Sequence, residues 1–209
     1  MNHTILIVDD SPFIVEGLAA ILKRKGYNTL TAHGGDECLV LLQTVVPDLV
    51  LLDIMMEPMD GWETLDHIKS NPTTKEIPVL MFSAKKITPA EAEEHSINIE
   101  NFVSKPVSPA QLLESIQKIF SRKNDLKMEE LAAQNAGLDR SLIEEHSTIR
   151  KRIEIDRNML AVIKSSVGMD IPGREISHEE KEAIRKLEDK IHGDERRLKE
   201  IDEKFSKTG

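Results

Sequence analysis

The chain has 209 residues, of which 39% are hydrophobic and 31% charged, and its formal net charge is −9. This charge disfavours nonspecific binding to nucleic acids or anionic membranes, and an aromatic content of only 3% argues against an all-β core. The single cysteine, Cys38, cannot form an internal disulfide and is typical of a small buried side chain in a reducing compartment. No targeting signal or membrane-spanning apolar window is visible, so a cytoplasmic location is expected.

Short apolar runs alternate with amphipathic stretches over residues 1–123. Five runs are predicted to be strands: Ile5–Val8, Thr29–Thr31, Leu49–Leu52, Val79–Phe82 and Phe102–Ser104. Five helices are predicted to follow them in turn, at about 12–25, 35–45, 61–71, 89–96 and 108–122. This alternation predicts an α/β domain with a parallel, doubly wound sheet and right-handed crossovers.

The sequence changes character after Lys123. Residues 125–167 and 176–205 are rich in charge, and their apolar side chains recur every three or four positions, as in a coiled-coil seam. The segment 168–173 between them contains two glycines and a proline, which predicts a chain reversal. Residues 124–209 are therefore expected to form an all-α antiparallel helical hairpin.

A specific register follows if the two arms are aligned at the turn. Pairing Val167 with Ile176 would place Ile153 opposite Ile191 and Leu142 opposite Ile201. His146 would then lie near Asp194 and Leu198. Asp156 and Asp194 interrupt the two apolar seams, and we expect them to fix the register through polar contacts.

Five polar side chains stand where the predicted strands end. Asp9 and Asp10 follow the first strand, Asp53 follows the third, Ser83 the fourth and Lys105 the fifth. Ligands of a doubly wound sheet bind beyond the carboxyl ends of its strands. Three carboxylates at one edge need a cation, and hard oxygen ligands suit Mg²⁺. A carboxylate nucleophile, a metal ion, a lysine and a hydroxyl are the components of phosphoryl transfer to a carboxylate.

Residues 1–123 resemble the receiver domain of response regulators in two-component signal transduction. The motifs that carry the resemblance occur in order and at the family's spacing: Val8-Asp9-Asp10-Ser11, the segment from Asp53 to Gly61, Ser83-Ala84 and Lys105-Pro106. The resemblance implies a flavodoxin-like sheet and a phosphorelay function. It also implies that Asp53 is the phosphoacceptor and that a sensor histidine kinase is the phosphoryl donor.

The same resemblance assigns roles to the other site residues. It implies that Asp9, Asp10, Asp53 and the backbone carbonyl of Met55 bind Mg²⁺. Ser83 and Lys105 are expected to contact the phosphoryl group, and Lys105-Pro106 is expected to be a cis peptide.

Two positions bear on switching and on the lifetime of the phosphoryl group. Phe102 matches the aromatic switch position, which turns inward when Ser83 is drawn to the phosphoryl group. Glu57 stands where the family usually has a proline, and an extra acid there is expected to affect metal affinity or phosphoryl lifetime.

The 124–209 region allows several output functions. Output by self-association or by docking to another protein is expected, and self-association is favoured, as a homodimer through these helices, because a two-helix hairpin buries only one narrow seam. His146 raises the alternative of a histidine phosphotransfer unit. DNA binding is a further alternative, but 17 basic against 20 acidic residues from Asn124 onward argue against it. No catalytic motif is visible there, so an enzymatic output is not expected.

Overall fold

The computed structural model describes residues 3–84, 88, 91, 95, 98–135, 139–167 and 175–208. A sheet of five parallel strands has the order β2-β1-β3-β4-β5. Its strands are β1 (Thr4–Val8), β2 (Asn28–Ala32), β3 (Leu49–Asp53), β4 (Val79–Ser83) and β5 (Asn101–Ser104). The predicted parallel sheet is confirmed, and each strand lies within one residue of its predicted bounds.

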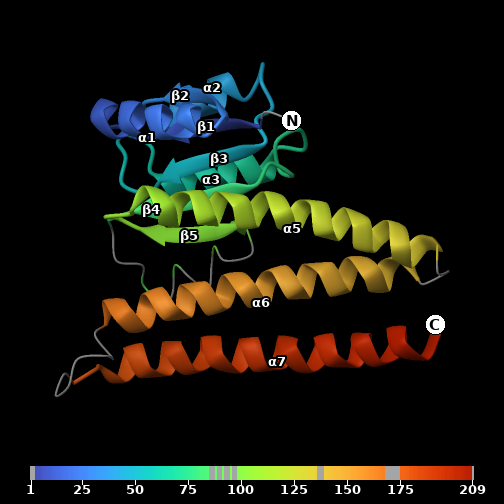
Figure 1. Ribbon diagram of the computed structural model, residues 1–209. Coiled ribbons are helices and arrows are strands. Elements are labelled where there is room, and N and C mark those ends of the chain that lie inside the picture. Colours follow the sequence, from blue (N-terminus) through green and yellow to red (C-terminus); the bar gives the residue numbers. More distant parts are fainter. Residues whose placement is uncertain are drawn as a thin grey trace. The chain divides into compact units, whose positions relative to one another are not determined.

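Helices cover both faces of this sheet, with α1 on one face and α3 on the other (Figure 1). The described helices are α1 (Pro12–Arg24), α2 (Gly35–Leu41), α3 (Gly61–Ser70), α5 (Pro109–Asn135), α6 (Arg140–Ser166) and α7 (His178–Thr208). Because both faces are covered, β3 and β4 are buried along their whole length. The helix predicted at 89–96 lies almost wholly outside the described residues. No described helix combines the length and the apolar character needed to cross a bilayer.

Helix α5 is longer than the sequence predicted. It begins after Ser108, whose hydroxyl and backbone N–H exchange hydrogen bonds with Gln111 in a capping box. It then continues without a break to Asn135, past the predicted helix end at 122. The proposed domain boundary after Lys123 therefore falls inside a helix, and α5 belongs to both compact units of the chain, Met1–Lys86 with Asn98–Ser115 and Ile87–Ile97 with Ile116–Gly209.

The helical stretch expected over 125–167 is divided between the end of α5 and α6. A new helix, α6, begins at Arg140, and Asp139 is its N-cap, accepting a hydrogen bond from the backbone N–H of Ser141. The heptad pattern begins at Leu142, inside α6, and an aspartate at the N-cap stabilises the start of this helix. Helix α7 also begins with a capping box, between Ser177 and Glu180.

Helices α6 and α7 pack against each other, and their ion pairs show that they run antiparallel. Lys164, near the end of α6, contacts Glu188 early in α7, whereas His146 contacts Asp202 near the end of α7. The hairpin prediction is confirmed for this helix pair. Its register differs from the prediction by about one turn at His146, which contacts Asp202, four residues beyond Leu198, whereas the pair of Glu145 with Arg197 fits the predicted alignment.

The two aspartates that interrupt the seams form ion pairs across the hairpin. Asp156 is fully buried and its Oδ2 lies 3.0 Å from Lys190 Nζ. Asp194 forms a two-bond ion pair with Arg152. These are charge contacts of the kind that the sequence predicted for the two positions.

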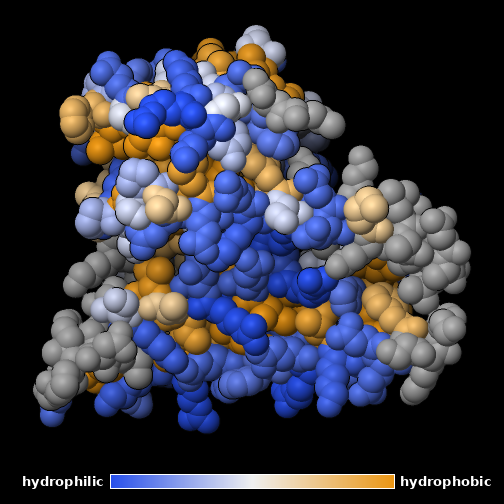
Figure 2. All heavy atoms as spheres, in the orientation of Figure 1, coloured by the Kyte–Doolittle hydropathy of each residue, from blue (hydrophilic) through white to orange (hydrophobic). Residues whose placement is uncertain are grey.

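Helix α6 buries a second stripe as well as the seam. Ile155 and Met159, one turn apart and offset from the seam residues, are each 1% exposed. Helix α7 buries a single apolar stripe, which includes Ile184, Ile191 and Ile201. On the face seen in Figure 2, hydrophilic side chains line the outer edge of α7, and apolar ones lie between α6 and α7.

Candidate functional site: an acidic cluster at the carboxyl edge of the sheet

Three carboxylates meet where β1 and β3 end. The two strands pair in parallel with Val8 opposite Leu52, so Asp9 and Asp10 emerge beside Asp53. One carboxylate oxygen from each of the three aspartates lies within 4.8 Å of the others. Asp9 and Asp53 are buried, whereas Asp10 is exposed. The sequence prediction that these acids converge is confirmed.

Lys105 supplies positive charge to the cluster. Its Nζ lies 2.7 Å from Asp9 Oδ2 and 3.1 Å from Asp53 Oδ2, and 4.4 Å from the centre of the Phe82 ring. The backbone N–H of Lys105 donates to the carbonyl of Ser83, which joins the ends of β5 and β4. Ser83 is fully buried at this edge, and Lys105-Pro106 is a cis peptide as predicted.

The electrostatics of Asp53 reflect its buried position. Burial raises the pKa of this carboxyl and the charge of Asp9 raises it further, while Lys105 and the backbone N–H of Met55 act in the opposite direction. Backbone N–H groups also hold the acids, since Ser11 donates to Asp9 Oδ1 and Ile54 to Asp53 Oδ1. Three carboxylates against one ammonium leave a charge of −2 when all are ionised, which fits a divalent cation bound by hard oxygen ligands.

The segment after β3 forms an acidic rim. A hollow beside the cluster is lined by Asp10, Ile54, Met55, Met56, Glu57 and Asp60. The Met55 side chain is 57% exposed, so the residue whose carbonyl is a predicted Mg²⁺ ligand lies at the open side of the site. Glu57 lines the same hollow as Asp10, and the effect of this extra acid on metal affinity or phosphoryl lifetime stays a prediction.

Gly61 has a role that its sequence context did not reveal. Asp60-Gly61 was interpreted as a turn before a helix, and Asp60 is indeed the N-cap of α3, accepting from Glu63 N–H. However, a Cβ atom at Gly61 would lie 2.0 Å from the backbone oxygen of Asp53. The glycine is therefore needed because α3 starts in direct contact with the backbone of Asp53. No local sequence signal distinguishes this close approach from an ordinary turn glycine.

Phe102 is buried on β5, with 2% of its surface exposed. It pairs with Met81 of β4, two residues before Ser83. A phenyl ring has no hydroxyl to keep near water, so burial is its favoured state. The inward position predicted for the switched state is thus already the position in this structure.

Two further sequence predictions concern residues outside the cluster. Cys38 is buried, and burial raises the pKa of its thiol to about 12, so it is an unreactive core residue as predicted. His146 packs against Phe205, and its Nε2 lies 2.9 Å from Asp202 Oδ1. A phosphotransfer histidine must present a ring nitrogen to its partner, so this geometry does not favour the phosphotransfer alternative.

Comparison with known proteins defines the class. A family model described as the response regulator receiver domain matches residues 5–117, and one described as metanogen output domain 2 matches residues 122–209. The chain belongs to the response regulator receiver family.

Several known proteins are similar in sequence to this chain over half of its length or more. The chain is 30% identical over 152 residues, 70% of its length, to the alkaline phosphatase synthesis transcriptional regulatory protein PhoP of Bacillus subtilis. It is 31% identical to protein PilG of Pseudomonas aeruginosa over 54% of this chain and 84% of that one. It is 35% identical over 77% of its length to a probable cyclic di-GMP phosphodiesterase of Vibrio cholerae. The chain spans only 62% of PhoP and 34% of the phosphodiesterase.

Solved structures support the fold. The chemotaxis response regulator CheY4 of Vibrio cholerae is 27% identical, with 57% of this chain and 99% of that chain covered and a TM-score of 0.53. A CheY-like receiver domain protein from Methanospirillum hungatei is 25% identical, with 60% and 99% covered and a TM-score of 0.55. Both matches have the extent expected of the receiver part alone.

Proposed function

We propose that in this phosphorelay response regulator Asp53 accepts a phosphoryl group from a sensor histidine kinase. The observation that supports this most is the buried Asp53 carboxylate at a sheet edge beside Asp9 and Asp10, with Lys105 Nζ 3.1 Å from its Oδ2. A carboxylate oxygen attacks the phosphorus of phosphohistidine. The new O–P bond forms as the P–N bond breaks, and the electron pair leaves with the imidazole.

Mg²⁺ is the proposed cofactor of this site. Asp9, Asp10, Asp53 and the backbone carbonyl of Met55 would hold it, and the ion would offset charge on the phosphoryl oxygens. Lys105 and the Ser83 hydroxyl would bind phosphoryl oxygens directly. Lys105 is already positioned for this by its contacts with Asp9 and Asp53.

The proposed switch connects Ser83 to β5, whose Phe102 pairs with β4 next to it. Because Phe102 is already buried, we propose that phosphorylation changes the packing around the ring, with no inward rotation from solvent. The phosphorylation signal would then be expressed as a shift of β5 and of α5, which follows it.

The proposed output is non-catalytic, and the protein is proposed to act in the cytoplasm. The signal is proposed to pass through α5. The observation behind this is that one unbroken helix runs from Pro109 to Asn135 and so belongs to both compact units. Residues 1–123 would serve as the receiver and 124–209 as the output region. A rigid helix that crosses the boundary transmits a displacement more directly than a flexible linker.

The chemistry is tested by labelling with acetyl phosphate. Asp53→Asn should abolish acid-stable, hydroxylamine-sensitive phosphorylation, since an amide is not an anionic nucleophile. The matched control is Asp36→Asn, an exposed acid in the first turn of α2, which should label as the parent does. Undiminished labelling of Asp53→Asn would disprove the assignment.

The signal route is tested by breaking α5. Asn124 is exposed on this helix, and Asn124→Pro removes a helical hydrogen bond at a cost of about 3 kcal/mol. Labelling of Asp53 should persist, but the change in hydrogen exchange of α6 and α7 on beryllofluoride addition should be lost. Asn124→Ala is the control and should keep the change. If Asn124→Pro keeps it too, α5 is not the route.

Self-association through residues 124–209 stays a second proposal. Its original basis was that a hairpin buries only one seam, yet α6 buries Ile155 and Met159 within a single chain as well. Among the described residues of this unit, Met128 is the one large apolar side chain that is strongly exposed. Light scattering with and without beryllofluoride tests the homodimer, and a monomer in both states would exclude it.

A further inference from the structure

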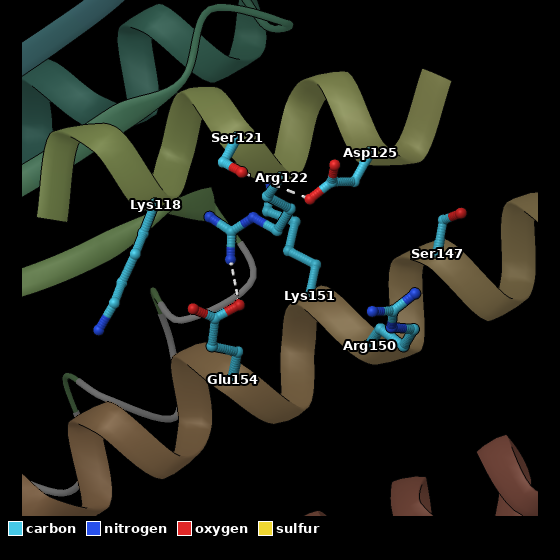
Figure 3. A pocket seen from close by; sticks show the side chains of 8 residues that line it. All are labelled: Lys118, Ser121, Arg122, Asp125, Ser147, Arg150, Lys151 and Glu154. Atoms are coloured by element: carbon cyan, nitrogen blue, oxygen red, sulfur yellow. Dashed lines mark hydrogen bonds and ion pairs between the residues drawn. The ribbon is translucent and has the colours of Figure 1, made fainter. Parts of the chain in front are cut away.

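Two cationic side chains of the described chain have partners of different kinds. In the recess between α5 and α6, Figure 3 shows Arg122 directed toward Glu154, which accepts a hydrogen bond of 2.8 Å from Arg122 Nη1. The Glu154 side chain is 56% exposed, so this is a surface ion pair of small energy. At the acidic cluster, by contrast, Lys105 Nζ lies 4.4 Å from the centre of the Phe82 ring, and only 19% of the Lys105 side chain is exposed.

Phe82 is held beside the phosphoacceptor by the sheet itself. It pairs with Asp53 of β3 on one side and with Val103 of β5 on the other. Paired residues of neighbouring strands point to the same face of a sheet, so the ring lies on the same side as the Asp53 carboxylate. Phe82 is 1% exposed, and β4 is buried along its whole length. The ring is therefore both shielded from water and fixed in place.

Burial alone does not require an aromatic residue at this position. The preceding residues of β4, Val79, Leu80 and Met81, are buried and not aromatic, and a leucine at position 82 would satisfy burial as well. A phenyl ring adds a negatively polarised face, which attracts an ammonium group most strongly where water is excluded. The ring thus gives Lys105 a partner that neither ionises nor binds metal.

This difference between the partners of Lys105 matters when a metal ion is bound. Lys105 Nζ also contacts Asp9 Oδ2 at 2.7 Å and Asp53 Oδ2 at 3.1 Å. A divalent cation bound by the same carboxylates offsets their charge and so weakens their attraction for the lysine. The attraction of the Phe82 ring does not change, because a phenyl group offers no ligand atom.

We propose that Phe82 is a positioning residue, which keeps the Lys105 ammonium group beside Asp53 once metal has engaged the carboxylates. The proposal rests on the proposed phosphoacceptor function and adds a residue that acts on the phosphoryl group only through Lys105. Without the ring, the flexible Lys105 side chain would sample more conformations. Ordering it again on a phosphoryl oxygen would then cost binding free energy.

The test compares the affinity of the full chain for beryllofluoride, a phosphoryl analogue, with its affinity for Mg²⁺ alone, both by calorimetric titration. Replacing Phe82 by trifluorophenylalanine nearly preserves the shape of the ring but removes the negative character of its face. At saturating Mg²⁺ this change should weaken beryllofluoride binding about threefold to tenfold, and monofluorophenylalanine should weaken it less. The affinity for Mg²⁺ alone should not fall, because the ring contacts the lysine that competes with the metal for Asp9 and Asp53.

A second variant and a control separate the electrostatic role of the ring from simple packing. Phe82→Leu, which removes the ring and keeps the position apolar, should weaken beryllofluoride binding by a similar factor. Trifluorophenylalanine at Phe120, a buried ring on α5, is the matched control and should bind both ligands as the parent does. Weakening by Phe82→Leu but not by trifluorophenylalanine at position 82 would show that the ring only fills volume, and would overturn the proposal.

Two other results would also decide against it. An equal loss of Mg²⁺ and beryllofluoride affinity would indicate a general disturbance of the site, and binding like that of the parent by every Phe82 variant would leave the ring without a role. Both results leave the phosphoacceptor function intact. Beryllofluoride binding by Asp53→Asn as tight as that of the parent would instead refute the phosphoacceptor function, and with it the role of Phe82.

Discussion

The ion pair between Asp156 and Lys190 should dominate the stability of the α6–α7 hairpin. Asp156 is 0% exposed, and its carboxylate accepts no hydrogen bond from the described residues, so Lys190 Nζ at 3.0 Å is a main source of compensating charge, with Arg152 near by. Removing one partner of a buried pair costs about 3–5 kcal/mol. The Lys190 side chain is 34% exposed, and water reaches it, so Lys190→Met should destabilise the hairpin by about 2–3 kcal/mol.

Replacing both partners should reverse the loss. Asp156→Leu with Lys190→Met leaves no buried charge, and such replacements are neutral or stabilising by about 1–4 kcal/mol. The assay is urea unfolding of the full chain followed by circular dichroism at 222 nm, with hydrogen exchange of α6 and α7 peptides to assign the transition. Lys186→Met is the control, since its pair with Glu182 is exposed on both sides and should matter by less than about 0.5 kcal/mol. Equal effects of Lys190→Met and Lys186→Met would refute the burial of Asp156 and this register.

Three further predictions concern other parts of the molecule. Gly61→Ala should destabilise the receiver by about 3 kcal/mol and slow phosphorylation, because its Cβ would lie 2.0 Å from Asp53 O; Gly17→Ala, with open space around it, should be neutral or slightly stabilising by urea unfolding. Asp10→Ala should weaken Mg²⁺ binding and acetyl phosphate labelling together, and metal-independent labelling at the parent rate would contradict it. Arg197 holds the pKa of Glu145 below its ordinary 4.5, so this carboxylate stabilises the hairpin above that pH and loses the effect as pH falls through the lowered pKa. Arg197→Gln should therefore flatten the acid dependence of the melting temperature below pH 4.5.

The receiver could be predicted from the sequence because its signals are local. A buried strand such as β3 has an unbroken apolar run, Leu49–Leu52, and the order of the strands along the chain places Asp9 and Asp53 at one edge without further information. Two features of the receiver site could not be predicted, because they depend on how closely the backbone of one segment approaches that of another. The contact of Gly61 with Asp53 and the acidic rim at Glu57 both depend on how one loop packs against β3.

The hairpin register could be predicted only to within about one turn, and its periodicity explains why. Apolar residues recur every three or four positions, so sliding one helix by a turn still places apolar side chains against apolar ones. Only the charged positions distinguish the registers. The predicted alignment put His146 near Asp194 and Leu198, whereas in the structure His146 contacts Asp202 and Asp194 pairs with Arg152. The length of the connection between α6 and α7, which sets the register, carries no comparable pattern.

Rigid elements on both sides of the predicted domain boundary limit how a signal can travel. Sliding of α7 along α6 would uncover the charge of Asp156 or leave it unpaired, so the ion pairs oppose a change of register. Helix α5 has 27 residues and is therefore about 40 Å long. A tilt of about 2° at its receiver end would move its far end by roughly 1–2 Å, a displacement typical of allosteric helix shifts. Motion of α5 as a whole therefore has the lowest free-energy cost among the ways to displace the C-terminal helices. Asn124→Pro should prevent this motion from reaching them while leaving the phosphorylation of Asp53 unchanged.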